Sequence, residues 1–133
     1  MTLFTSEICI LLIADNEPLQ HAVKNFLKRD QDLSVVGMDP GEDKGLHDIE
    51  NLDPQVILLD LDQPESNALV TIHRLRTTFP ETMIIALSFV DGQSYQRVTL
   101  NAGADAFIHK PEMGDQLIPA IHRLAQNHRP RSR

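Results

Sequence analysis

Short apolar runs alternate with segments of helical spacing along this 133-residue chain. We expect the runs to be strands, and they lie at five places: Ile8 to Ala14, Leu33 to Met38, Val56 to Leu61, Met83 to Leu87 and Ala106 to His109. Runs with so little polar interruption are typical of parallel strands that helices cover on both faces. Strict alternation of strands and helices therefore predicts one doubly wound parallel sheet, which is an α/β fold.

The segments between the runs carry the signals of helix ends. Pro18 suits the first turn of a first helix, where its missing N–H would have no partner. Pro80 stops the third helix, and Gly103 is suited to the position just after the fourth. Asp115 is expected to cap the last helix. A short second helix is expected around Leu46 to Leu52.

Four of the apolar runs end on residues suited to phosphate chemistry, which are Asp15 with Asn16, Asp60, Ser88 and Lys110. In a parallel α/β sheet, ligands collect at the carboxyl ends of the strands, so these side chains are expected to converge. Asp60 could act as a nucleophile and form an acyl phosphate. Because nucleophile and donor are both anionic, the reaction needs charge neutralisation, which Mg²⁺ held by carboxylates supplies.

The composition excludes several classes of function. A formal net charge of −7 makes the chain a poor candidate for binding nucleic acid or anionic membranes. No apolar stretch approaches the length of a membrane span, and the N-terminus lacks the basic region of a signal peptide, so a cytoplasmic location is expected. The basic "HRPRSR" at 128–133 is interpreted as a tail or the start of a linker, which leaves 1–127 as a single domain.

Four segments together carry a resemblance to a known family: "LLIADNEPL", "PQVILLDLDQP", "IIALS" and "NAGADAFIHKPE". In order and spacing they resemble the receiver (CheY-like) domain of two-component response regulators, over about Ile8 to Leu124. The resemblance implies a flavodoxin-like (βα)5 three-layer sandwich whose five parallel strands lie in the order 2-1-3-4-5. It also implies a signalling receiver in a phosphorelay rather than an enzyme acting on a separate substrate.

The family's roles carry over onto this sequence position by position. Asp60 corresponds to the phospho-acceptor, with Ser88 and Lys110 as the catalytic groups that contact the phosphoryl oxygens. Ser88 and Phe107 correspond to the switch residues. The implied Mg²⁺ ligands are oxygens at four positions: Asp15, Asn16, Asp60 and the backbone carbonyl of Asp62.

The resemblance also implies partners and kinetics. A sensor histidine kinase or a phosphotransfer protein would donate the phosphoryl group. In the family, the face formed by the fourth helix, fifth strand and last helix often mediates homodimerisation or docking. Only self-catalysed phosphoryl transfer and a slow autodephosphorylation are expected, because Val90 cannot hydrogen-bond a hydrolytic water through its side chain.

Two departures from the family pattern support an alternative. Asn16 stands where the family usually has a second acid, which lowers the expected Mg²⁺ affinity, although Asn16 also suits a helix N-cap. Asp62 could compensate in part if its side chain turns inward. Phe89 replaces a small residue, and it either narrows access to the site or packs against the next helix. The alternative is a pseudo-receiver that binds proteins without taking phosphate.

A third hypothesis is a phosphatase of the haloacid dehalogenase type. Asp60, Leu61 and Asp62 mimic its D-x-D motif, and Ser88 and Lys110 follow in a compatible order. That family, however, carries its nucleophile on the first strand and needs an acidic pair after the lysine. The sequence therefore favours the receiver over the phosphatase.

Overall fold

A parallel five-stranded sheet in the order β2-β1-β3-β4-β5 forms the centre of the computed structural model, which describes residues 7–40, 49–62 and 67–127. The strands are β1 (Ile8–Ile13), β2 (Leu33–Asp39), β3 (Val56–Asp60), β4 (Met83–Ser88) and β5 (Ala106–His109). The helices are α1 (Glu17–Leu27), α3 (Ala68–Thr78), α4 (Gln93–Ala102), the 3₁₀ turn η1 (Lys110–Glu112) and α5 (Met113–Asn127). The fold class and the strand order predicted from the sequence are confirmed.

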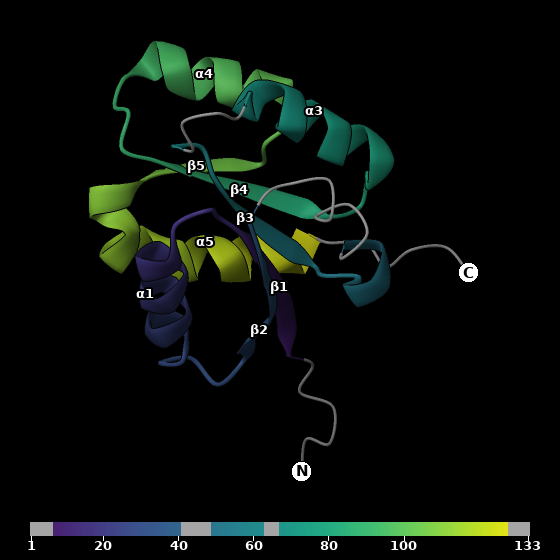
Figure 1. Ribbon diagram of the computed structural model, residues 1–133, viewed down its shortest axis with the longest axis vertical. Helices are drawn as coiled ribbons and strands as arrows, with labels where there is room; N and C mark the ends of the chain where they lie inside the picture. The colour runs from purple at the N-terminus through teal and green to yellow at the C-terminus, as the bar shows by residue number, and fades with distance from the viewer. Residues whose placement is uncertain (1–6, 41–48, 63–66, 128–133) are drawn as a thin grey trace.

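Helices cover both faces of the sheet, with α1 and α5 on one side and α3 and α4 on the other (Figure 1). The central strand β3 is buried along its whole length. Val56 and Leu58 join the core under α1 and α5, whereas Ile57 and Leu59 join the core under α3. Alternate side chains of a strand point to opposite faces, so one apolar run supplies both cores.

Local signals begin and end the helices as the sequence predicts in two cases. The Asn16 side chain accepts a hydrogen bond from the Leu19 N–H at 3.0 Å and so caps α1, with Pro18 in its first turn. Gly103 follows the last residue of α4 and adopts a φ of +129°, a backbone conformation that residues other than glycine rarely adopt. A Cβ on Gly103 would also lie 2.9 Å from Cβ of Arg76.

The start of the last helix differs from the prediction. The expected cap at Asp115 is wrong, because η1 follows β5 directly and runs into α5 at Met113. Pro111 favours this early winding, since its fixed φ suits the first position of a helical turn. Asp115 therefore lies inside the first turn of α5, where its charge still favours the helix dipole.

The expected helix at 46–52 falls partly outside the described residues. Residues 49–52 are helical, and Ile49 is fully buried in the core under α3, but 46–48 are not described. The interpretation of 128–133 as a tail likewise concerns residues that are not described. None of the helices seen in the described part of the chain has the length and apolar character that crossing a bilayer requires.

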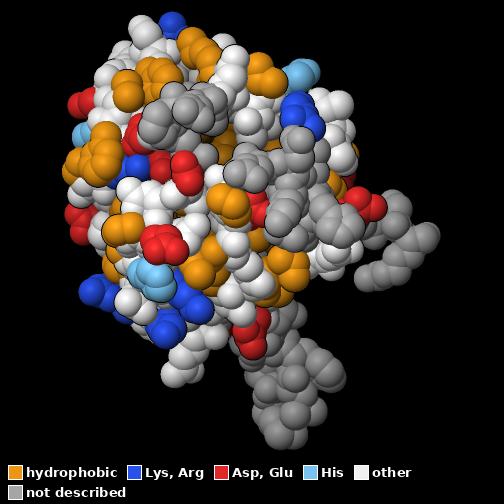
Figure 2. All heavy atoms as spheres, in the orientation of Figure 1, with side chains coloured by type: hydrophobic (Ala, Val, Ile, Leu, Met, Phe, Trp, Pro, Cys, Tyr) orange, Lys and Arg blue, Asp and Glu red, His pale blue; other side chains and the backbone are white. Residues whose placement is uncertain are grey.

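Figure 2 shows one face of the molecule, on which apolar and acidic side chains are interspersed. Basic side chains gather at the lower left, over the end of α1. The acidic side chains on this face thus do not form one large patch.

Candidate functional site

The register of the sheet brings three predicted site residues to one edge. Asp60, the last residue of β3, pairs with Leu87 of β4. The next residue of β4, Ser88, pairs with His109 at the end of β5, and Lys110 follows immediately. Because all five strands are parallel, these side chains extend from the carboxyl ends of three adjacent strands.

Asp60 and Lys110 form a buried ion pair at the centre of this edge. Lys110 Nζ lies 2.7 Å from Asp60 Oδ1, and the two residues are 7% and 4% exposed. The backbone N–H of Asp62 donates a second hydrogen bond to Asp60 Oδ1 at 3.0 Å. Charges with so little access to water persist when they are paired, so the ammonium of Lys110 offsets the charge of the Asp60 carboxylate.

The Asp62 side chain turns inward and joins the same cluster. Its Oδ1 accepts a hydrogen bond from Ser88 Oγ at 2.8 Å. Its Oδ2 accepts the backbone N–H of Phe89 at 2.8 Å and lies 2.8 Å from Lys110 Nζ. Partial burial raises the pKa of the Asp62 carboxyl, but the bonds from Lys110, Phe89 and Ser88 outweigh it and hold the pKa below its ordinary value.

Lys110 is held as an ammonium by its neighbours. Burial lowers its pKa, and the hydrogen bonds and charges of Asp60 and Asp62 outweigh burial, so the pKa lies above its ordinary value. Nζ also lies 4.7 Å from the ring centroid of Phe89, within reach of a cation–π interaction. Phe89 itself is 64% exposed, so it covers the ammonium instead of packing against the next helix.

One cleft of about 620 Å³ is lined by all four predicted metal-site residues. It is lined by Asp15, Asn16, Pro18, Asp60, Asp62, Phe89 and Lys110. Its lining combines three carboxylates with one ammonium, which leaves an excess of negative charge. Carboxylate and amide oxygens are the hard ligands that Mg²⁺ prefers, so the residues present fit this ion.

The predicted switch residue Phe107 is linked to the cluster through Tyr95, which the sequence analysis did not single out. The two rings pack edge to face with centroids 5.9 Å apart, and Phe107 is half-buried. Burial raises the pKa of Tyr95, the charge of Asp62 adds to this, and a hydrogen bond with Ser88 opposes it. Tyr95 thus packs against the predicted switch ring of Phe107 and lies near Ser88, the predicted switch hydroxyl.

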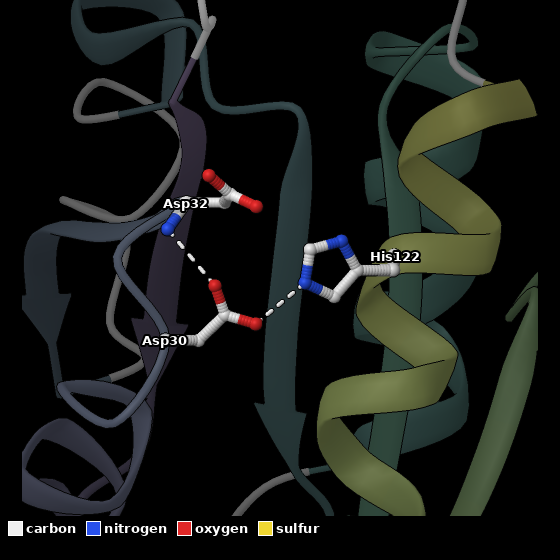
Figure 3. Close-up of side chains that lie close together, drawn as sticks. All are labelled: Asp30, Asp32 and His122. Atoms are coloured by element: carbon white, nitrogen blue, oxygen red, sulfur yellow. Dashed lines mark hydrogen bonds and ion pairs between the residues drawn. The ribbon is translucent and has the colours of Figure 1, made fainter.

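A second group of potential metal ligands lies at the opposite edge of the sheet (Figure 3). There Asp30, Asp32 and His122 bring ligand atoms within 4.8 Å of one another. His122 Nε2 lies 2.6 Å from Asp30 Oδ2, and the Asp32 N–H donates to Asp30 Oδ1 at 2.9 Å. These bonds tie α5 to the loop before β2, and they account for the grouping without a metal.

Comparisons with known proteins agree with this geometry. The family model for the response regulator receiver domain matches residues 10–122. The nitrate/nitrite response regulator protein NarL of Escherichia coli is 34% identical over 116 residues, which are 87% of this chain and 54% of NarL. This chain thus spans about half the length of that relative.

Solved structures share the fold. The response regulator domain of CheB from Thermotoga maritima superimposes with a TM-score of 0.81 at 23% identity, over 93% of this chain and 99% of that one. The isolated receiver domain of RcsB from Salmonella enterica, solved with phosphomimetic BeF₃⁻, gives 0.82 at 17% identity, over 94% and 93%. This chain therefore belongs to the receiver domains of two-component response regulators, the phosphorylatable signalling modules that its strand-end motifs predict.

Proposed function

We propose that Asp60 is the residue that accepts the phosphoryl group. The observation that carries this proposal is its pairing with Lys110 at 2.7 Å, at the floor of an acidic cleft on the carboxyl edge of the sheet. Asp60 is the cleft carboxylate that ends the central strand, whereas Asp15 is exposed and Asp62 follows the strand. Its position on β3 instead of β1 also argues against the phosphatase hypothesis.

The chemistry is a displacement at phosphorus. A carboxylate oxygen of Asp60 attacks the phosphorus of a phosphohistidine or of acetyl phosphate. A new P–O bond forms, and the bond to the donor breaks with its electron pair going to the imidazole nitrogen or to acetate. Lys110 offsets the charge on the phosphoryl oxygens, and Ser88 donates a hydrogen bond to one of them.

The metal ion in this proposal is Mg²⁺. Oxygens of Asp15, Asn16, Asp60 and the backbone carbonyl of Asp62 would hold it. When bound, Mg²⁺ neutralises charge between the incoming donor and the acceptor. The Asn16 oxygen that caps α1 has a second lone pair, so capping and metal binding are compatible there.

We further propose a histidine kinase or phosphotransfer protein as donor, in a cytoplasmic setting. The chain would act as a single receiver domain over 1–127, with catalysis limited to its own phosphorylation and slow autodephosphorylation. The face formed by α4, β5 and α5 is the proposed surface for docking or homodimerisation. Tyr95 and Phe107 support this choice, because they connect Ser88 to α4 and β5.

Incubation with Mg²⁺ and acetyl phosphate, followed by intact mass, tests the proposal. We expect the mass gain of one phosphoryl group, its absence in Asp60→Asn, and its loss when EDTA replaces Mg²⁺. Borohydride reduction of the acyl phosphate, followed by peptide mapping, should place the label at Asp60. A label at Asp62 or Asp15 would contradict the assignment.

The pseudo-receiver remains a second candidate because of one specific observation. The carboxylate of Asp62 already accepts the hydrogen bond of Ser88. It also forms one of the two ion pairs of Lys110. A wild-type chain that gains no mass with acetyl phosphate, while it stays folded, would favour this candidate.

A further inference from the structure

The carboxylate of Asp62 is held by three donors, which lie at the end of one strand or directly after a strand. Ser88 donates from the last residue of β4, the Phe89 N–H from the residue after β4, and Lys110 from the residue after β5. These contacts use both oxygens of Asp62, each at 2.8 Å. The arrangement is a built anion site, and its present occupant belongs to the chain itself.

Two of these donors are the groups assigned above to the phosphoryl oxygens. Ser88 is fully buried and has one hydroxyl proton. Its Oγ accepts the Val90 N–H at 2.9 Å, which leaves the proton directed to Asp62. A phosphoryl group on Asp60 and the carboxylate of Asp62 therefore cannot both receive this hydrogen bond.

We infer that the Asp62 carboxylate is an internal competitor that occupies the phosphoryl-binding position of the unphosphorylated chain and must leave it when Asp60 is phosphorylated. This inference rests on the proposed function, because it assumes that the phosphoryl group arrives on Asp60. It assigns to the side chain of Asp62 a role separate from that of its backbone carbonyl.

The Asp62 carboxylate has open space into which it can rotate. The side chain of Asp62 is 22% exposed and lines the open cleft, whereas that of Asp60 is 4% exposed. Rotation about the side-chain bonds can move the carboxylate into the cleft while the Asp62 N–H keeps its bond to Asp60. Repulsion between a dianionic phosphoryl group and the nearby carboxylate would favour this rotation.

While Asp62 occupies Ser88 and Lys110, the apparent affinity of the site for a phosphoryl group is lowered. Any anion that needs Ser88 and Lys110 binds only the fraction of molecules in which Asp62 has left, so its apparent affinity falls by that fraction. The unphosphorylated chain also already holds Ser88 in a hydrogen bond to an anion. Phosphorylation should therefore be slow, and its structural effect on the switch residues small.

The test compares Asp62→Ala with the wild type in the full chain. The substitution removes the carboxylate and keeps the backbone carbonyl assigned to the metal site. We expect phosphorylation by acetyl phosphate with Mg²⁺ to be about tenfold faster, and beryllofluoride, a phosphoryl mimic, to bind about tenfold more tightly. Asp62→Asn keeps the shape and loses the charge, so it should fall between the two.

Glu17→Gln is the matched charge control. Glu17 is exposed at the start of α1, on the same edge of the sheet, so its loss changes the field without freeing Ser88 or Lys110. We expect wild-type kinetics from this variant. Equal acceleration in Glu17→Gln and Asp62→Ala would overturn the inference, because net charge would then explain the effect.

An NMR measurement tests the contact without any phosphate. In Asp62→Ala the amide of Phe89 loses its acceptor, so its resonance should move upfield and its hydrogen exchange should speed up, in contrast to Glu17→Gln. Unchanged exchange at Phe89 would show that the amide has no bond to Asp62 and would overturn the inference.

The outcomes separate the two proposals. If the wild type is labelled and Asp62→Ala is labelled no faster, the competitor is refuted and the function stands. If only Asp62→Ala is labelled, the competitor is supported and the wild type is a pseudo-receiver. If neither chain is labelled or binds beryllofluoride, the proposed function fails and the inference fails with it.

Discussion

The two edges of the sheet hold similar ion pairs in different surroundings. At the carboxyl edge, one ammonium serves two carboxylates within 2.8 Å, and an exposed third carboxylate lines the same cleft. At the amino edge, the guanidinium of Arg76 pairs with Asp105 and also bonds the backbone carbonyls of Gly103, Pro80 and Thr82.

The difference lies in what each cluster leaves unbalanced. The Arg76 cluster pairs one cation with one carboxylate and uses the remaining donors on carbonyls, so it needs no further ion. The carboxyl edge has more negative than positive charge and opens into a cleft of about 620 Å³. Balanced clusters of this kind stabilise a fold, whereas an unbalanced and accessible one is suited to binding an ion.

Removing the cation of the carboxyl edge gives the largest effect that this comparison predicts. Lys110→Met should slow phosphorylation by acetyl phosphate by roughly 100- to 1,000-fold, because a fixed charge on the transferring group is lost. A time course of intact mass with Mg²⁺ measures the rate. Lys110→Arg keeps the charge in a different shape and should recover part of it. A wild-type rate in Lys110→Met would break the distinction between the two edges.

Removing the cation of the amino edge should affect stability instead. Arg76→Met removes the cation that pairs with Asp105, whose carboxylate keeps the Ile84 N–H as a donor, and it removes the hydrogen bond to the carbonyl of buried Thr82. It should lower the free energy of unfolding by about 2–4 kcal/mol. Urea denaturation measures this, and phosphorylation below the transition should stay within about twofold of wild type. Arg74→Met, an exposed arginine of the same helix, should change stability by less than about 0.5 kcal/mol.

The positions of most site residues could be predicted because they depend on strand ends. Asp60, Ser88 and Lys110 end or follow apolar runs, and parallel pairing then fixes which side chains meet. The inward turn of Asp62 could not be predicted in this way. Its nearest partner in the sequence, Ser88, is 26 residues away, and its side-chain direction is set by donors at the ends of other strands.

The difference at Asp115 and the outcome of the open alternative at Phe89 have local causes. Asp115 precedes an apolar stripe, as a cap would, but Pro111 lies earlier and starts the winding sooner. Phe89 has the apolar character of a packed residue, yet its exposed ring lies against the ammonium of Lys110. In both cases the structure depends on a neighbouring residue, Pro111 or Lys110, that the apolar periodicity does not indicate.

A second acidic residue at position 16 should strengthen the binding of Mg²⁺ at the carboxyl edge. Asn16→Asp should raise Mg²⁺ affinity by about tenfold, since a carboxylate replaces an amide in the proposed ligand set. Because Asp caps helices as well as Asn does, α1 should keep its stability. Titration calorimetry measures the affinity, and Asn16→Ser, which caps without the amide, should bind more weakly. Equal affinity in all three chains would remove position 16 from the metal site.

The smallest effect concerns the pair of Asp30 and His122 at the amino edge. The hydrogen bond from His122, and then that from the Asp32 N–H, lower the pKa of Asp30 from its ordinary value of 3.8. The pair therefore contributes stability that is present above pH 3.8 and is lost as the pH falls through the lower, folded-state pKa.

Because the pair is partly solvated, its contribution should stay below about 1 kcal/mol. Urea denaturation at pH 6 and at pH 3 measures it: Asp30→Asn should lose less stability between these values than the wild type. His122→Gln removes the other member of the pair and should reduce the pH dependence of stability by a similar amount. An identical pH dependence in all three chains would mean that this contact, unlike Arg76 with Asp105, does not tie the amino edge together.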